Sequence, residues 1–224
     1  PFTDNLRDEE LISTVAENLP SLIPKKGSAL VVGLGNREIT PDALGPKSVS
    51  GVLATRQIGT ELARVAGIEG VRSVSVISPG VLGQTGVEAF DLLHAISKEI
   101  NPNFVIAVDA LASRYLRRLG CTVQMSDSGI EPGAGVGNAR REISRKTLGV
   151  PVIALGVPTV VDAATLVSDL TEGKGEVVSP DGRQMIVTPR EIDLLIDRAS
   201  ALIADSINRA LHPQISPEII KELL

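Results

Sequence analysis

Aromatic side chains are scarce in this sequence: its 224 residues include three Phe, one Tyr and no Trp. Few rings are therefore available to stack on bases. Positive charge is not in excess either, because 22 Lys and Arg against 27 Asp and Glu give a net charge of −5. These two features argue against a nucleic-acid-binding protein. The core must be aliphatic, since hydrophobic residues still make up 43% of the chain, as in ordinary globular proteins.

Cysteine and histidine are almost absent as well, with Cys121, His94 and His212 as the only ones. A single cysteine cannot form a disulfide within the chain, which is typical of a reducing compartment and predicts a cytoplasmic protein. So few thiols and imidazoles predict neither a zinc site of a familiar type nor a cofactor. No apolar run approaches the ~20 residues that a membrane helix needs, and the N-terminus lacks the pattern of a signal peptide. We therefore expect no membrane association.

Short aliphatic runs alternate with segments of helical periodicity along most of the chain. Runs of Val, Ile, Leu and Ala that end in Gly or Asp are typical of strands buried on both faces of a parallel sheet. We therefore predict an α/β fold, with an open, mostly parallel sheet flanked by helices, as a single domain over residues 1–224. A stretch rich in Gly, Glu, Lys and Asp at about 171–186 is predicted to be a linker-like excursion.

The last predicted helix has the clearest boundaries, because Thr188, Pro189 and Glu191 match a capping box ahead of a long apolar face. The predicted strands cover residues 29–35, 71–77, 104–110, 121–125 and 151–156. The predicted helices cover the first 20 or so residues and then residues 49–58, 86–100, 111–119, 140–148, 160–170 and about 189–207.

Two glycine-rich segments resemble nucleotide-binding loops but lack their decisive residues. Gly33 and Gly35 follow a predicted strand, yet the third glycine of a dinucleotide fingerprint is replaced by Glu38, whose charge would repel a pyrophosphate. The loop at 133–138 has no Gly-Lys-Ser/Thr behind it, which excludes a P-loop. Its glycines either allow an unusual backbone conformation or form a cradle for substrate.

Acidic residues, in contrast, lie at the ends of several predicted strands. Asp42 follows the first strand, Asp109 ends the third, and Asp127 and Asp162 come after later ones. Loops after parallel strands open at the same edge of the sheet, where carboxylates that converge raise one another's pKa. A protonated acid beside an ionised one suits water-mediated peptide hydrolysis. Alternatively, Asp42 and Asp109 only stabilise the starts of neighbouring helices.

Five blocks of the sequence resemble the germination protease family of spore-forming bacteria. The resemblance extends over residues 30–169 and resumes over 187–212, which is most of the chain. The five blocks are Gly33-Leu34-Gly35-Asn36 with Thr40-Pro41-Asp42-Ala43-Leu44-Gly45-Pro46, the segment 78–86 (SPGVLGQTG), the segment 104–112 (FVIAVDALA), Ser126-Asp127-Ser128-Gly129 with the segment 132–138 (PGAGVGN), and the segment 156–163 (GVPTVVDA).

This resemblance implies an activity, a site and an assembly. It implies a protease that degrades small acid-soluble spore proteins at germination, in the forespore or spore core, made as an inactive precursor and assembled as a homotetramer. The family's two essential aspartates correspond to Asp42 and Asp109. The family's core is similar to that of the hydrogenase-maturation proteases, whose acids bind metal together with a His. No His stands at a matching place here, so we expect no metal. The stretch between Leu170 and Val187 is shorter than the family's usual insertion.

We therefore expect an aspartate-dependent endopeptidase in which Asp42 and Asp109 share one crevice and activate a water molecule between them. Other residues are expected to bind substrate or support the site, and these are Asn36, Ser126, Asp127, Gly133, Gly135 and Gly137. One alternative is a metal-dependent maturation-type protease that uses the same acids as ligands. Another is a non-catalytic, oligomeric binding protein of the same fold. Some apolar side chains after residue 212 are expected to cover a patch on the same or a neighbouring subunit.

Overall fold

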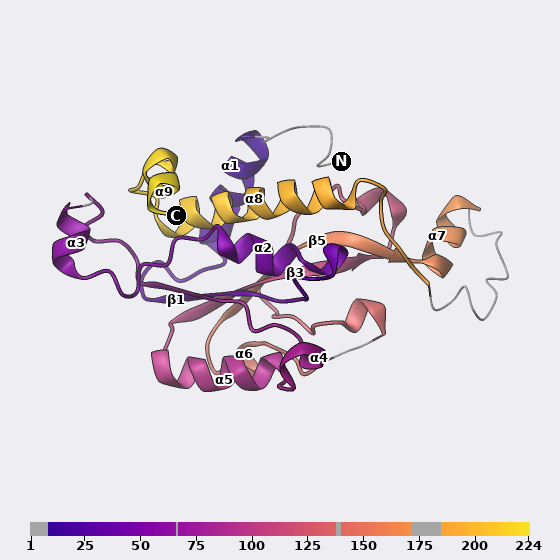
Figure 1. The fold of residues 1–224 in the computed structure, drawn as a ribbon, viewed down its shortest axis with the longest axis horizontal. Helices are drawn as coiled ribbons and strands as arrows, with labels where there is room; N and C mark the ends of the chain where they lie inside the picture. Colours follow the sequence, from indigo (N-terminus) through magenta and orange to yellow (C-terminus); the bar gives the residue numbers. More distant parts are fainter. Residues whose placement is uncertain (1–8, 66, 138–139, 172–184) are drawn as a thin grey trace.

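The computed structural model describes residues 9–65, 67–137, 140–171 and 185–224, which form a six-stranded sheet between two layers of helices (Figure 1). The strand order is β2-β1-β3-β5-β4, and β6 pairs with β5 outside this path. β1, β2, β3 and β5 are parallel, whereas β4 and β6 run antiparallel to β5. The strands are β1 (Ala29–Gly33), β2 (Val74–Ile77), β3 (Phe104–Ser113), β4 (Gln124–Ser126), β5 (Val152–Asp162) and β6 (Ile186–Val187).

Helices cover both faces of this sheet. α2 and α8 lie on one face and α4, α5 and α6 on the other (Figure 1). None of the described helices is both long and apolar enough to span a membrane. The helices are α1 (Glu9–Asn18), α2 (Leu44–Ser50), α3 (Thr60–Val65), α4 (Leu82–Thr85), α5 (Ala89–Ile100), α6 (Arg145–Leu148), α7 (Ala163–Leu170), α8 (Ile192–Leu211) and α9 (Pro217–Leu223). Short 3-10 turns cover Leu19–Ser21, Thr40–Asp42, Leu116–Arg118 and Ala134–Val136.

The aliphatic runs are strands because both of their faces are buried. Side chains alternate between the two faces of a strand. In β3, Ile106 and Val108 pack in the core beneath α8, whereas Val105 and Ala107 pack against α5. A strand covered on both sides needs apolar residues at every position, and this is why the runs show no alternation of polar and apolar residues. The predicted mostly parallel α/β fold is confirmed.

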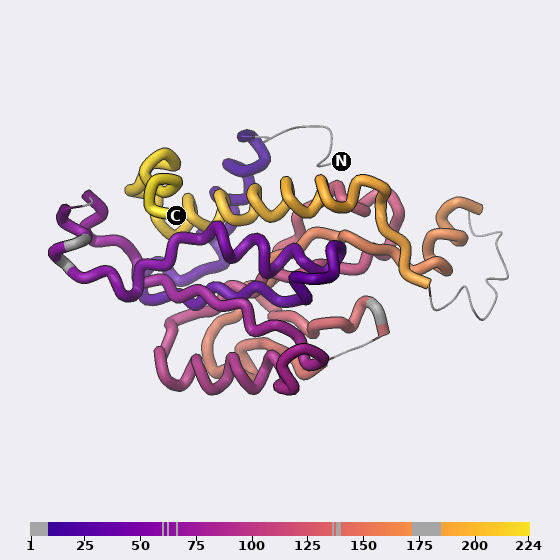
Figure 2. Tube along the Cα trace, viewed as in Figure 1, coloured from indigo at the N-terminus to yellow at the C-terminus, as the bar shows by residue number. Residues whose placement is uncertain are grey.

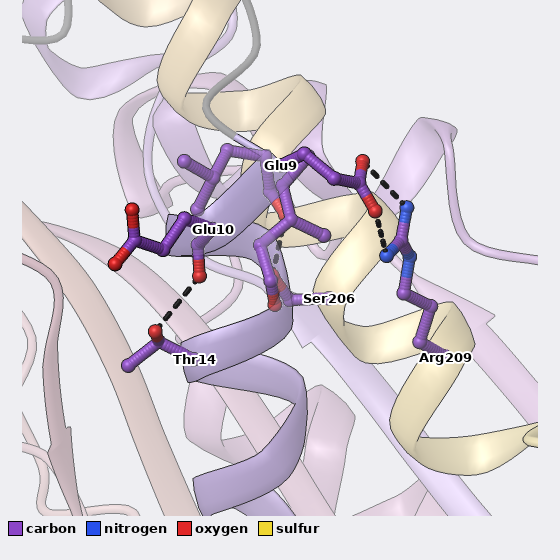
Figure 3. Close-up of polar contacts among 7 residues, drawn as sticks. Glu9, Glu10, Thr14, Ser206 and Arg209 are labelled. Atoms are coloured by element: carbon purple, nitrogen blue, oxygen red, sulfur yellow. Dashed lines mark hydrogen bonds and ion pairs between the residues drawn. The ribbon is translucent and has the colours of Figure 1, made fainter.

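The first and last long helices lie side by side although they are far apart in the sequence (Figure 2). Glu9 of α1 forms a two-pronged ion pair with Arg209 of α8, one bond of which, from Nη2 to Oε2, is 3.0 Å long (Figure 3). Ser206 of α8 donates a hydrogen bond to the carbonyl of Ile12. α1 therefore packs as an outer element on the same face of the sheet as α8.

The predicted ends of β3 and β5 are wrong, because both strands are longer than predicted. The helix predicted at 111–119 is instead a continuation of β3 to Ser113, because this segment pairs with β5. β5 itself runs past Pro158 to Asp162, and the register shifts between Leu111 and Ala112. Proline is tolerated in a strand at such an irregularity, since no regular ladder bond from its nitrogen is needed there. Both strands therefore extend well beyond the end of β1.

Other boundaries moved by a few residues. The helix predicted at 49–58 begins earlier, as α2, because Pro46 lies in its first turn, where backbone N–H groups need no helical partner. The predicted capping box at 188–191 is wrong: α8 begins at Ile192 without a side-chain cap, and the Thr188 hydroxyl bonds to the Pro189 carbonyl. The helix predicted at 140–148 is reduced to α6, which has its own capping box between Ser144 and Thr147.

Two further predictions concern the C-terminal half. Residues 172–184 of the predicted excursion lie outside the described residues, whereas Ile186 pairs with β5 as part of β6. Past α8, the side chains of Ile215 and Ile220 are buried against Leu53 and Ile68, so part of the C-terminal segment covers an apolar patch of its own chain.

Candidate active site

Asp42 lies in the loop after β1, and Asp109 lies in β3 just past the point where β1 ends beside it. Asp109 belongs to β3, one residue beyond Val108, whose carbonyl accepts a hydrogen bond from the N–H of Leu34. After β1 the chain folds back sharply, and the first turn of α2 rests on both strand ends. A methyl group on Gly45 would overlap the carbonyl oxygens of Leu34 and Val108, so only glycine allows this contact. The close contact holds the Asp42 loop against the end of β3.

Both aspartates line a single cavity of about 880 Å³. The cavity lies beyond the carboxyl end of β1 and beside the last part of β3, at the edge of the sheet where open α/β folds bind their ligands. Its wall also includes Asn36, Gln124 and Thr159. The structure thus brings Asp42 and Asp109 into one crevice, as the positions of their strands suggested.

The two carboxyl groups have different surroundings. Asp109 is only 6% exposed, and its Oδ1 accepts a hydrogen bond of 2.9 Å from the N–H of Ala110. Burial, together with the negative charge of Asp42, raises the pKa of Asp109 to about 7. Asp42 is half-buried, which raises its pKa, while a hydrogen bond of 2.6 Å from the N–H of Asn36 to its Oδ2 works in the opposite direction. Asp42 is therefore the acid that ionises first, and Asp109 keeps a proton near neutral pH.

Hydrogen bonds from distant segments fix the loop that carries Asp42. The hydroxyl of Thr159, a fully buried residue of β5, donates a bond of 2.7 Å to the carbonyl of Pro41. Asn36 accepts bonds at its Oδ1 from the N–H of Glu38 and from the side chain of Gln84, at 3.0 and 2.8 Å. The loop is thus tied to strand β5 on one side and to α4 on the other.

Three of the residues that are expected to bind substrate or support the site line the cavity, namely Asn36, Gly133 and Gly135. Gly135 lies against the side chain of Ala112, and a methyl group there would overlap it. Gly137 does not belong to the described wall of the cavity.

Ser126 and Asp127 do not line the described wall of the cavity either, although the loop that follows them does, from Gly129 to Gly135. β4 is antiparallel to β5, so the chain moves away from the site as it passes through Ser126. Ser126 pairs with Ala154, two residues before the Gly156 that stands beside Asp109. The residue of β4 beside Gly156 is Gln124, which lines the cavity and which sequence reasoning missed because nothing along the chain reveals the direction of a short strand.

Asp162 has a purely structural environment. Its carboxylate caps α7 and accepts bonds from the N–H and the hydroxyl of Thr165, at 2.9 and 2.6 Å. These bonds lower the pKa of Asp162, the opposite of the change at Asp109.

The carboxylates on the described wall of the cavity are not gathered into a metal-binding group. Within the described residues, no group of three or more His, Cys, Asp and Glu side chains could hold a metal ion. His94 stacks on Phe90 at a ring distance of 5.5 Å, and His212 is fully buried at the end of α8. The residues present therefore do not fit the metal-dependent alternative.

Comparison with known proteins shows to which family the chain belongs. A family model described as germination protease matches residues 4–173 and 174–223. The chain belongs to the germination protease family. Membership of this family identifies the chain as a peptidase. The germination protease of Priestia megaterium is 39% identical over 257 residues, covering 88% of this chain and 69% of that protein. The relatives from Caldanaerobacter subterraneus and Clostridium tetani are 42% and 41% identical to this chain. The two alignments cover 97% and 99% of this chain, and each covers 78% of the relative.

A solved structure supports the fold independently of sequence. The [NiFe] hydrogenase maturation protease HycI from Thermococcus kodakarensis superposes with a TM-score of 0.50 and covers 87% of this chain and 98% of its own. At 15% identity this likeness shows the fold alone. The arrangement of sheet and helices is thus shared with the maturation proteases, as the resemblance implied.

Proposed function

We propose that the protein is an endopeptidase that cuts small acid-soluble spore proteins in the spore core, with Asp42 and Asp109 activating a water molecule between them. The observation that carries this proposal is the unequal pair of carboxyl groups on one cavity, in which burial raises the pKa of Asp109 to about 7. Family membership supplies the reaction class, because its relatives are named germination proteases.

The different surroundings suggest different roles for the two acids. Asp42, ionised first, takes a proton from the water as its oxygen attacks the peptide carbonyl. The protonated carboxyl of Asp109 donates a hydrogen bond to the carbonyl oxygen as that oxygen becomes negative. Its proton then passes to the leaving amine as the C–N bond breaks. Asn36 and the backbone N–H groups near Gly133 and Gly135 lie on the same wall and could be further donors to the oxyanion.

Isosteric substitution tests the mechanism. Asp42→Asn and Asp109→Asn keep the shape of the side chain but remove its titrating proton, so each variant should fold and lose several orders of magnitude in kcat. The double variant should be scarcely worse than either single one, because residues that act as a unit are strongly non-additive. Asp162→Asn, at the cap of α7, is the matched control and should keep its activity. Substantial cleavage of purified spore protein by folded Asp109→Asn would overturn the mechanism.

Two measurements address the alternatives. Cleavage that survives a strong chelator and does not increase with added divalent ions supports the aspartate mechanism over a metal-dependent one. A protein that binds spore proteins but leaves them intact under all these conditions would instead be a non-catalytic binding protein.

We also propose that the protein assembles as a homotetramer. The resemblance to the family suggests this number, and exposed apolar side chains on the last helix offer a contact surface, since Ile219, Leu223 and Leu224 are 37%, 40% and 59% exposed. Light scattering at micromolar concentration should give four times the mass of one chain, and a monomer would contradict the proposal.

A further inference from the structure

One edge of β3 loses its neighbour at the candidate site. β1 pairs with β3 only as far as Gly33 beside Val108, but β3 continues through Asp109 to Ser113, five residues further. On its other side this extension stays paired with β5 up to Val161. Among the described strands, none fills the place beside β3 that β1 has left. An edge of this kind is a template for another strand.

The burial of β3 changes at the same point. Every residue from Phe104 to Asp109 is buried, whereas Ala110, Leu111 and Ala112 are half-exposed. These three residues line the cavity that also contains Asp42 and Asp109. The open edge is therefore part of the wall of the candidate active site and adjoins its buried acid.

The hydrogen-bonding direction of β3 can be read from bonds at its start and middle. The N–H of Val105 donates to Pro151 beside β5, whereas the carbonyl of Val108 accepts from Leu34 beside β1. Successive residues of a strand face opposite edges, so Ala110 faces the open side. Its N–H is taken by the carboxylate of Asp109, which leaves its carbonyl as an acceptor on this edge.

We propose that the substrate binds as an extended strand in the place vacated by β1, pairing through its backbone with β3 from Ala110 onward. This inference rests on the proposed function, and it specifies how the peptide is held. Ala110 and Ala112 carry small, neutral side chains, so recognition at this edge depends on main-chain hydrogen bonds rather than on charge. A peptide in this place runs alongside Asp109, and its N–H groups that face β3 meet the carbonyl of Ala110.

Backbone methylation of a substrate peptide tests this binding mode. A site cut in a purified spore protein is located by mass spectrometry, and a synthetic peptide spanning it is made with a single N-methyl group at each position in turn. Each methyl removes one N–H donor and leaves the side chain unchanged. Only alternate N–H groups of an extended peptide face β3, so kcat/KM should fall by about tenfold or more at every second position near the cut. The positions in between are the matched controls.

The outcomes separate this inference from the proposed function. If wild-type protein cuts the unmodified peptide and the losses alternate, the strand pairing is supported. If it cuts the peptide but the losses do not alternate, the pairing is refuted while the protease function stands; another segment, such as a second copy of the chain, would then cover this edge. If the wild-type protein does not cut intact spore proteins, the proposed function is refuted, and so is substrate binding at the open edge of β3.

Discussion

Replacing Asp109 by Asn should make the protein more stable while it abolishes activity. The carboxyl group is buried, and folding raises its pKa from 3.8 to about 7. Between these two pH values the folded protein holds a proton that the unfolded chain has released, so stability falls as the pH rises through this window and then levels off. At about 1.4 kcal/mol for each pKa unit, the full loss is about 4 kcal/mol.

Asparagine cannot ionise, and its side-chain oxygen can still accept the hydrogen bond from Ala110. The Asp109→Asn variant should therefore match the wild type below pH 4 and exceed its free energy of unfolding by about 4 kcal/mol at pH 8. Urea denaturation followed by circular dichroism from pH 4 to pH 8 measures this difference. The matched control is Asp162→Asn, because the pKa of Asp162 is lowered and its ionised form is the more stable one in the folded protein.

Two results would contradict the raised pKa of Asp109. One is an Asp109→Asn variant that is no more stable than the wild type at pH 8, and the other is a difference in the free energy of unfolding that does not change with pH. Either result would mean that Asp109 is ionised in the folded protein without cost. The same titration predicts a fall in the rate of peptide cleavage above about pH 7, because the proposed acid has then lost its proton. A rate that stays constant from pH 6 to pH 9 would contradict that role.

Three further substitutions address the supports of the site. Thr159→Val leaves the carbonyl of Pro41 without its partner and should lower kcat by about tenfold with little change in KM, while Thr159→Ser should restore it; unchanged kinetics would show that this bond does not position Asp42. Asp162→Ala removes the cap of α7 and should cost about 0.5–2 kcal/mol in urea denaturation with activity kept, so loss of activity would count against a structural role. Gly45→Ala should cost about 1–3 kcal/mol, because its methyl group overlaps two backbone carbonyls, and thermal unfolding would show no change if the contact were loose.

The sequence predicted the sheet well because its central strands are buried on both faces. A run such as Val105-Ile106-Ala107-Val108 has no polar position, and burial alone explains that composition. The positions of Asp42 and Asp109 followed from the same pattern, since Asp42 lies in the loop after one buried run and Asp109 follows the last aliphatic residue of another. The shared cavity was therefore predictable, although the roles of the two acids depend on burial that only the fold defines.

The ends of β3 and β5 were not predictable from local sequence. Ala110, Leu111 and Ala112 have good helix propensity, and the chain forms a strand there only because β5 lies alongside. Pro158 would ordinarily end a strand, but the register shift beside it accommodates the missing N–H. Long-range pairing decides both cases, and the same pairing creates the open edge and brings Gln124 to the cavity. Thr159 was missed for this reason, since its partner Pro41 lies 118 residues away in the sequence.

Asp109, the proposed catalytic acid, and Asp162, a structural one, have opposite surroundings. The carboxylate of Asp162 satisfies an N–H and a hydroxyl at the start of a helix, which stabilise its charge and lower its pKa. Among the described residues, the carboxyl of Asp109 has one N–H partner; it is buried and lies near a second carboxylate, so its charge is unfavourable in the folded state. The residues of β3 that precede Asp109 pack as aliphatic core, and an uncharged side chain at this position would fold at lower cost. A carboxyl whose charge is this costly, on the wall of the cavity that also contains Asp42, supports the proposal that Asp109 is a proton donor near neutral pH.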